Sequence, residues 1–250
     1  MPFNRARNYR GKVGILYPCE IKQLKMEVLD EGLAPGANQN NDLNELIANG
    51  YDFDFGKYIS DGFDVFKKEA GSFIGFGILS GLIIALAGMI PFGGVIVSAP
   101  LTIGYSIYAH KVAHDQSRQF SDFFKGFSGK IFGQLILVSI VGGILSVLGM
   151  ILFILPGIYL AVGYIFASQI VLFYDPKVEF WEAMELSRKL VTKNWWSFFG
   201  LLIVAGLIAM SGVLLLGIGL LITAPIASCI LYAAFNDIVK PSPDALDYLS

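Results

Sequence analysis

Hydrophobic and charged positions are separated along this chain into alternating segments. Residues 70–110, 131–174 and 194–236 contain no Asp, Glu, Lys or Arg. These three uncharged stretches are 41, 44 and 43 residues long, and all charged side chains lie between or outside them. A soluble helix does not need this separation, because its outer face must be wetted. A bilayer-spanning helix does, since a charge at mid-bilayer costs at least about 2.5–3.5 kcal/mol.

Each uncharged stretch is long enough to cross a bilayer twice. A hydrocarbon core of about 30 Å takes about 20 helical residues. Turns are predicted at "MIPFGGV" (Pro91, Gly93, Gly94), "FILPGIY" (Pro156, Gly157) and "LLLGIGLL" (Gly217, Gly219). The pattern thus predicts six transmembrane helices, near 71–90, 94–110, 131–153, 156–174, 197–216 and 219–236. The breaks could instead be kinks in long tilted helices, but 41 or more residues would overshoot a bilayer.

Composition and charge agree with a membrane protein. The chain is 55% hydrophobic and 15% charged, against about 25% charged in ordinary soluble domains. Its formal net charge of −2 gives no support to a nucleic-acid partner. The first thirty residues lack the continuous apolar stretch of a cleavable signal peptide. Cys19 and Cys229 suggest neither a disulfide nor a zinc site, by spacing or by compartment.

Lys and Arg predict the orientation in the membrane. Every one lies before residue 70, in 111–130, in 175–193 or after 236. Three hairpins with two crossings each would put all these segments on one side. The positive-inside rule makes that side cytoplasmic, together with both termini. We therefore expect a multi-pass protein of the bacterial inner membrane, its bacterial origin being inferred only from the resemblance described below.

The chain also repeats itself at an offset of 125 residues. Residues 62–81, "GFDVFKKEAGSFIGFGILSG", align with residues 187–206, "SRKLVTKNWWSFFGLLIVAG". At the same offset the dipeptide "AP" at Ala99 meets "AP" at Ala224. The middle stretch is a looser third copy, with Pro156 near the place of Pro100. Any two glycine-rich apolar stretches align somewhat, but the shared offset favours a true repeat. The predicted units are 53–110, 114–174 and 178–236.

A short amphipathic helix is predicted before each hairpin. Apolar residues recur there at spacings of three and four, which places a mostly apolar stripe on one face of a helix. The three stripes are Phe55, Ile59, Gly62 and Phe66; Phe120, Phe124, Phe127 and Ile131; and Phe180, Met184, Ser187 and Val191. Such helices should lie in the plane of the membrane interface.

The third of these helices leads into a cluster of basic and indole side chains. The lipid-interface candidates are Arg188, Lys189, Lys193, Trp195, Trp196 and Trp181. Indole rings favour headgroup depth, and basic groups attract anionic lipid. Two interpretations remain open. One is a lipid-binding collar, and the other is plain anchoring that positions the helices.

The predicted domain organisation has three parts. Residues 1–50 form a largely flexible cytoplasmic segment, with a basic start, a linker "GLAPGANQNNDLNEL" and one or two helical turns near 42–48. Residues 51–238 form the six-helix transmembrane domain, and residues 239–250 form a short cytoplasmic tail.

Few residues suggest catalysis or metal binding. His110 and His114 are four apart, with Asp115 beside the second, which resembles part of a metal site. The chain has only two His, so a polar end to the second helix explains them better. The HExxH pattern, a nucleophile elbow, a Walker loop and a dinucleotide fingerprint are all missing from the sequence. We expect no cofactor, no metal and no enzymatic activity.

Small and polar residues within the uncharged stretches are the remaining candidates. Gly71, Gly75, Gly77 and Gly81 form small-xxx-small pairs that favour close helix contact, although glycines facing lipid are an alternative. The polar intramembrane candidates are Gln134, Gln169, Tyr159 and Tyr164, with Ser98, Thr102, Ser139, Ser168, Thr223, Ser228, Tyr105 and Tyr232. The two glutamines could line a shallow vestibule or cap each other between neighbouring helices.

One resemblance follows from these motifs. "LPGIYLAVGYIF" followed by "WEAMELSRKLVTKNWWSFFGLL" resembles uncharacterised bacterial six-helix membrane proteins. It is similar to the membrane domain fused to some glycerophosphodiester phosphodiesterases. The resemblance covers about residues 51–238 and is densest over 155–202. It implies an all-helical inner-membrane protein with no established activity, and this chain has no room for the phosphodiesterase catalytic domain.

Together these patterns predict a fold and a class of function. We expect an all-α integral membrane protein of three parallel hairpins that binds or organises lipid, or supports a membrane partner. A small permease or channel for an apolar or neutral solute is the alternative, and a membrane enzyme ranks third. The expected partners are membrane lipids, anionic lipids among them, and a membrane protein or a second copy of the chain.

Overall fold

The computed structural model describes residues 36–90, 93–174, 178–214 and 219–249. The chain divides into two units, Met1–Gln39 and Asn40–Ser250, and the second contains all three predicted hairpins. Cys19, the basic start and residues 32–35 of the predicted linker lie outside the described residues, as do Pro91 and Gly217 of the predicted turns. The rest of the predicted linker is helical, so the linker prediction is wrong there.

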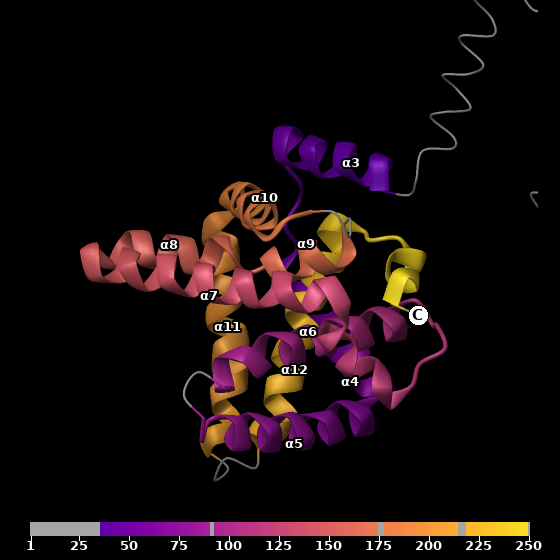
Figure 1. Cartoon of the computed structure of the whole chain (residues 1–250). Helices are drawn as coiled ribbons and strands as arrows, with labels where there is room; N and C mark the ends of the chain where they lie inside the picture. The colour runs from indigo at the N-terminus through magenta and orange to yellow at the C-terminus, as the bar shows by residue number, and fades with distance from the viewer. Residues whose placement is uncertain (1–35, 91–92, 175–177, 215–218, 250) are drawn as a thin grey trace, which may run out of the picture. The chain divides into compact units, whose positions relative to one another are not determined.

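The described chain is helical throughout, and no strand occurs in it. Its elements, drawn in Figure 1, are α3 (Gly36–Asn49), α4 (Phe55–Lys68), α5 (Ala70–Ala87), α6 (Gly93–Ala113), η1 (Phe120–Phe127), α7 (Gly129–Leu152), α8 (Ile154–Gly163), α9 (Ala167–Phe173), α10 (Phe180–Thr192), α11 (Trp195–Leu214), α12 (Leu220–Val239) and η2 (Pro243–Leu249). The helix predicted near 42–48 is longer, since α3 begins at Gly36.

Five of these segments are long and apolar enough to cross a membrane. They are Ala70–Ala87, Ile131–Leu152, Ile154–Phe173, Trp195–Val213 and Leu220–Val239. The chain is therefore all-helical with several membrane-span candidates, as the sequence predicts. The predicted span near 94–110 corresponds to α6, which is helical but not among the five. That helix contains polar residues such as Ser98 and Thr102 and is mostly buried from Ala99 onward.

Consecutive long helices pack against each other in pairs. The helices α7 and α8 lie side by side, as do α11 and α12, and α5 contacts α6. In Figure 1 the α11 and α12 pair runs across the direction of α5 and α7. The turn between α7 and α8 is Phe153 alone, in an extended conformation. The predicted turn at Pro156 and Gly157 is thus wrong by a few residues, because proline is tolerated in the first turn of a helix.

Glycines allow two of the helix pairs to approach closely near the turn. A Cβ added to Gly149 would lie 2.9 Å from the backbone of Gly157 across the α7 and α8 pair. A Cβ added to Gly219 would lie 2.8 Å from Gly212 across the α11 and α12 pair. Real Cβ atoms do not approach this closely, so any larger residue would push the two helices apart.

Apolar side chains near the turns are exposed, whereas the other ends of the helices are packed. Met89 is 83% exposed and Leu155 is 79% exposed, each beside a turn. At the other end Phe73, Phe76 and Phe123 are fully buried. The ring of Phe76 stacks on that of Phe123 with centroids 4.2 Å apart. The core therefore lies at the charged ends of the hairpins, and exposed apolar side chains lie toward the turns.

The short helices before the hairpins pack on the protein through one face. Gly62 of α4 meets the backbone of Ile230 in α12. On α10 the predicted residues Met184, Ser187 and Val191 are buried. The stripe predicted for η1 is wrong, because Phe120 and Phe127 are exposed while Phe123 is buried. The physical reason is that η1 is a 3₁₀ helix, whose three-residue turn puts a different set of positions on the inner face.

The C-terminal segment folds back onto the charged end of the hairpins. Leu246 of η2 is buried, and the Tyr248 hydroxyl donates to the Leu172 carbonyl at 2.6 Å. The side-chain amide of Gln116 donates to the Pro243 carbonyl at 2.6 Å. This segment is therefore a docked element of the fold rather than a loose tail.

Candidate functional site

A row of exposed side chains runs along α10 into α11, and we call it the boundary surface. It consists of Trp181, Lys189, Lys193 and Trp196. Trp181 is 59% exposed and Trp196 is 78% exposed, and both lysines are exposed. The row starts on the charged helix α10 and ends at the first turn of α11, where the uncharged stretch begins. Exposed indole and ammonium groups thus occur along α10 and where the uncharged stretch of α11 begins.

The other two interface candidates are held by the protein. The Arg188 guanidinium donates to both carboxylate oxygens of Glu185, at 2.7 and 3.0 Å, and to the Tyr159 hydroxyl at 3.3 Å. These hydrogen bonds and the nearby Lys189 hold the pKa of Glu185 below its usual value. The Trp195 ring stacks on Phe199 with centroids 5.2 Å apart. Arg188 and Trp195 therefore serve helix packing more than they face outward.

The buried hydroxyl of Ser187 bridges the break between α8 and α9. It donates to the Gly163 carbonyl at 2.7 Å and accepts from the Phe166 N–H at 3.1 Å. The sequence predicts one continuous helix here, but the structure has two, with Tyr164 between them outside helical geometry. An interrupted helix leaves backbone groups that need partners in an apolar setting. Ser187 supplies them from α10.

Polar residues from four helices converge on a pocket inside the hairpin domain, which we call the hydroxyl pocket. It has a volume of about 220 Å³. Its lining residues are Ser98, Ala99, Thr102, Ile103 and Ser106 of α6, Ser139 of α7, Ile165 beside α9, Ser168 and Gln169 of α9, and Ser228 and Leu231 of α12. Six of the predicted polar candidates, Ser98, Thr102, Ser139, Ser168, Gln169 and Ser228, are thus brought together by the fold.

Gln169 lies at the buried side of the hydroxyl pocket. It is 7% exposed, and its amide donates from Nε2 to the Ser106 hydroxyl at 3.1 Å. Its Oε1 is buried without a hydrogen-bond partner among the described residues. Thr102, on the same pocket, is exposed. The pocket therefore runs from an exposed rim at Thr102 to a buried side at Gln169, whose Oε1 has no hydrogen-bond donor in the described part of the chain.

The remaining polar candidates have structural partners. Gln134 accepts from the Phe180 N–H at 2.7 Å and so caps the start of α10. The two glutamines thus bind separate groups, and the expectation that they cap each other is wrong. Tyr159 pairs with the Thr192 hydroxyl at 2.8 Å. Tyr164 is half-buried at the break between α8 and α9 and lies near Gly142. Neither tyrosine lines the hydroxyl pocket.

The histidines close the charged end of α6. Buried His110 is hydrogen-bonded through Nδ1 to the Tyr232 hydroxyl at 2.9 Å and through Nε2 to the Pro243 carbonyl at 3.3 Å. The His114 Nδ1 is 3.0 Å from the His110 carbonyl oxygen. Within the described residues no group of His, Cys, Asp and Glu has the geometry to hold a metal ion. The histidines thus join α6 to α12 and to the docked C-terminal segment.

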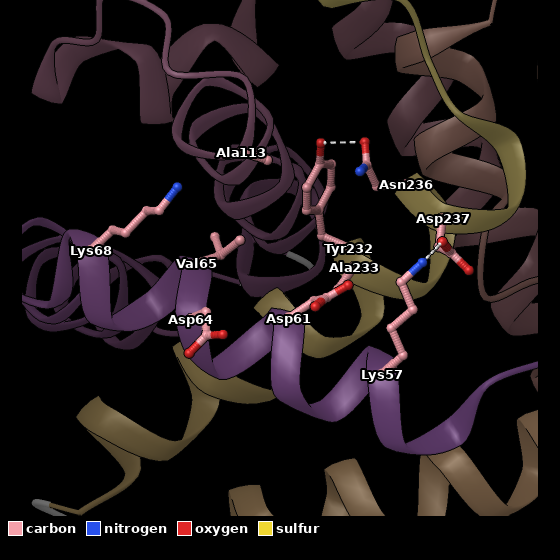
Figure 2. A pocket seen from close by; sticks show the side chains of 10 residues that line it. All are labelled: Lys57, Asp61, Asp64, Val65, Lys68, Ala113, Tyr232, Ala233, Asn236 and Asp237. Carbon is pink, nitrogen blue, oxygen red and sulfur yellow. Dashed lines mark hydrogen bonds and ion pairs between the residues drawn. The ribbon is translucent and has the colours of Figure 1, made fainter.

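A second pocket, of about 320 Å³, lies among charged side chains at the junction of α4, α6 and α12. Figure 2 shows Lys57 paired with Asp237, and Tyr232 donating to Asn236 at 3.0 Å. Asp61 and Asp64 lie along α4 on the same pocket. Side chains of both charges surround this pocket. The pair of Lys57 and Asp237 joins α4 to α12, so we assign these residues to helix packing.

Of the predicted packing glycines, only Gly77 makes a close contact among the described residues. A Cβ on Gly77 would lie 3.1 Å from the Leu221 carbonyl oxygen of α12. A Cβ on Gly75 would make an ordinary contact with Phe120. No atom of the described residues lies within 4 Å of a Cβ at Gly71 or Gly81, so these two do not pack closely on another helix there. The two glycine pairs lie on different faces of α5, and Gly77 is the member that contacts α12.

No family model, curated protein or solved structure matches the chain. The resemblance to bacterial six-helix membrane proteins therefore stays a prediction, and the site has to be understood from its own geometry.

Sequence reasoning missed two features of the site. Ser187 was placed on an apolar stripe, whereas its hydroxyl has a specific backbone role. The hydroxyl pocket was also missed as a unit, although its polar members were identified singly. Ile103 and Ser106 on α6 correspond at the repeat offset of 125 to Ser228 and Leu231 on α12. That coincidence of spacing was the signal that could have found the pocket.

Proposed function

We propose that this chain is a non-enzymatic integral membrane protein that binds and organises lipid at the cytoplasmic boundary of the bacterial inner membrane. The observation that carries the proposal is the boundary surface, where exposed indole and ammonium groups stand between charged and apolar segments. A Lys near an anionic membrane surface contributes about 1 kcal/mol of attraction. Exposed indoles set the depth, so the lysines do not have to hold the surface down alone.

In this proposal all three hairpins enter the bilayer from the cytoplasm. The exposed apolar surface near the turns supports it, since residues such as Met89 and Leu155 are unfavourable in water. The α6 helix then provides the sixth crossing, and its neighbours bury most of it from Ala99 onward. We expect the hairpins to align along a common axis in the bilayer, because each apolar turn region must reach hydrocarbon. Both termini remain on the cytoplasmic side.

Tryptophan fluorescence in vesicles tests the proposal directly. The chain has three Trp, and all three lie on α10 or at the start of α11. The full chain is reconstituted in vesicles that contain phosphatidylcholine or phosphatidylglycerol with brominated acyl chains, at low salt. We expect stronger quenching by the anionic lipid, and stronger quenching by bromine near the headgroup than by bromine near the chain end.

Matched variants distinguish the effect of the lysine charges from the depth of the indole rings in the bilayer. The double variant Lys189→Gln/Lys193→Gln should lose the preference for phosphatidylglycerol while keeping the quenching depth. Exposed Lys67 and Lys68 on α4 offer the control, since Lys67→Gln/Lys68→Gln removes the same two charges away from the boundary surface. Equal quenching of the unmodified protein by both lipids at low salt would contradict the proposal and leave α10 as a positioning element.

A second function is favoured by the hydroxyl pocket. A polar pocket among apolar helices is a feature of small permeases for neutral solutes. Uptake of a labelled polyol into liposomes that contain the protein would support this alternative. A lipid-organising protein without transport should leave uptake at the rate of empty liposomes.

A further inference from the structure

The sequence gives the distance of the hydroxyl pocket from the charged ends of its helices. Three of its lining residues lie nine positions from the nearest charged residue in the sequence. The pairs are Thr102 and Lys111, Ser139 and Lys130, and Ser228 and Asp237. Nine helical residues span roughly 14 Å. Half of a hydrocarbon core of about 30 Å is nearly the same distance. In a bilayer this part of the pocket therefore lies near the midplane, and Gln169 lies closer to the charged end of its helix.

The pocket also lies where the three repeat units meet. Ile103 and Ser106 on α6 and Ser228 and Leu231 on α12 occupy equivalent positions of the first and third units. The middle unit contributes Ile165 and Ser168, again three positions apart. The first and third predicted units thus present the same two positions to one cavity, and the middle unit contributes residues of its own. Membrane proteins built from repeats place their ligand sites at such junctions.

The lining determines the class of ligand. No charged side chain lines the pocket, and an ionised ligand without a counter-charge is strongly unfavourable at this depth. A purely apolar ligand would leave the Gln169 Oε1 without a donor. The ligand that fits is uncharged and carries at least one hydroxyl or amide N–H.

The exposed rim indicates the route of entry. Thr102 lies on the rim and is exposed at a depth where only lipid surrounds the protein. A ligand dissolved in the bilayer reaches this rim without crossing the packed charged end of the domain. The volume of about 220 Å³, roughly that of seven liquid water molecules, suits a small head group rather than a whole lipid.

We propose that the hydroxyl pocket binds the uncharged, hydroxyl-bearing head of a neutral lipid, with the lipid hydroxyl donating to the Gln169 Oε1 and the acyl chains leaving past Thr102. This site goes beyond the boundary surface, because it takes a neutral molecule inside the chain rather than anionic lipid at its edge.

Ligand-dependent thermal stability of the full chain in a mild detergent tests the site. The probes are dioctanoylglycerol for a lipid-phase hydroxyl, glycerol for a water-borne one, and dioctanoyl phosphatidylglycerol for an anionic head group. We expect dioctanoylglycerol to raise the unfolding temperature saturably, with glycerol at the same concentrations giving no shift. Apparent affinities are compared, so a variant with a lower starting stability still reports on binding.

Two variants and one control locate the binding. Gln169→Leu removes the acceptor and should weaken dioctanoylglycerol binding about fivefold or more. Ser228→Ile should also weaken it, by filling the pocket with the residue that Ile103 supplies at the equivalent position. Ser211→Ala is the control, because this exposed hydroxyl bonds only its own helix, at the Ile208 carbonyl, and lies outside the pocket. Its affinity should not change.

The outcomes separate this site from the boundary surface. Stabilisation by the anionic lipid belongs to the boundary surface and should be equal in the unmodified chain and in Gln169→Leu. Saturable binding of glycerol but not of dioctanoylglycerol would overturn the lipid origin of the ligand. If neither molecule binds, or if Gln169→Leu binds dioctanoylglycerol as tightly as the unmodified chain, the pocket holds only water and the proposal is wrong.

Discussion

The buried polar side chains of the described residues are of two kinds, those that complete the backbone and those that keep an atom without a partner, as Gln169 and Trp195 do. Ser187 and Gln134 each bond backbone groups that a helix break or a helix start leaves open. Gln169 instead keeps a buried acceptor without a donor. Buried polar groups in folded proteins are nearly all hydrogen-bonded. The first kind should therefore control stability, and the second should control binding.

The bridge at Ser187 gives a stability prediction. In Ser187→Ala the Gly163 carbonyl and the Phe166 N–H lose their partner. Leaving buried polar groups unsatisfied costs about 1–3 kcal/mol, so we expect a clearly lower thermal unfolding temperature in detergent. The exposed Ser211→Ala should unfold with the unmodified chain. An unchanged midpoint for Ser187→Ala would mean that water replaces the hydroxyl at the break.

Asp122 of η1 gives a prediction for pH. Its carboxylate is buried between Lys111 at 2.9 Å and Lys125 at 3.0 Å, and it accepts from the Gln119 N–H at 2.7 Å. Burial raises its pKa, but the N–H and the two ammonium groups outweigh burial, so the pKa lies below the ordinary 3.8. A carboxyl with a lowered pKa stabilises the fold above its ordinary pKa and loses that effect as pH falls.

We therefore expect Asp122→Asn to lose about 2 kcal/mol of stability at neutral pH. The difference from the unmodified chain should shrink as pH falls below 3.8, when the native carboxyl takes up its proton. Thermal unfolding between pH 3 and pH 7 measures both effects. A difference that stays constant over this range would show that the loss comes from packing and not from the charge.

At the scale of elements, helix contacts depend on which glycines face a neighbour. On α7, Gly149 lies against Gly157, whereas a Cβ on Gly143 would meet nothing within 4 Å. On α11, Gly212 lies against Gly219, whereas Gly206 is open. In both helices the open glycine precedes the packed one by six positions. Composition alone does not distinguish them, because all four lie in apolar helices.

These pairs give a matched test of hairpin packing. Gly149→Leu and Gly212→Leu should force the paired helices apart and cost about 1–3 kcal/mol each. Gly143→Leu and Gly206→Leu add the same side chain where space is open and should change stability little. Thermal unfolding in detergent compares the four variants. Equal losses in both sets would mean that leucine acts through the surrounding detergent and not through the hairpin contact.

For the whole molecule, the separation of charge from apolar surface predicts its topology. Single cysteines are placed in a chain whose Cys19 and Cys229 have been replaced. We expect cysteines at Ser117 and Glu182, which are exposed on charged segments, to react only from the cytoplasm. Cysteines at Met89 and Leu155 should react only from outside, or stay unreactive within the bilayer. Labelling of Ser117→Cys or Glu182→Cys from outside intact cells would rule out three hairpins of common orientation.

The sequence by itself determined the helical class, the place of the long helices and the separation of charged from apolar segments. These properties are local, because hydropathy over about 20 residues and the positions of Gly and Pro depend only on neighbours in the chain. It also indicated the buried residues of α10, because apolar residues that recur every three or four positions lie on one face of a regular α-helix.

Only the tertiary structure decided which residues act together. The break between α8 and α9 exists beside Ser187, which lies more than 20 positions further along the chain. The inner face of η1 follows from a 3₁₀ turn packed on α6, which no α-helical period predicts. The hydroxyl pocket needs four helices that are distant from one another in the sequence. Such contacts join residues distant in sequence, so their partners become known only when the helices are packed.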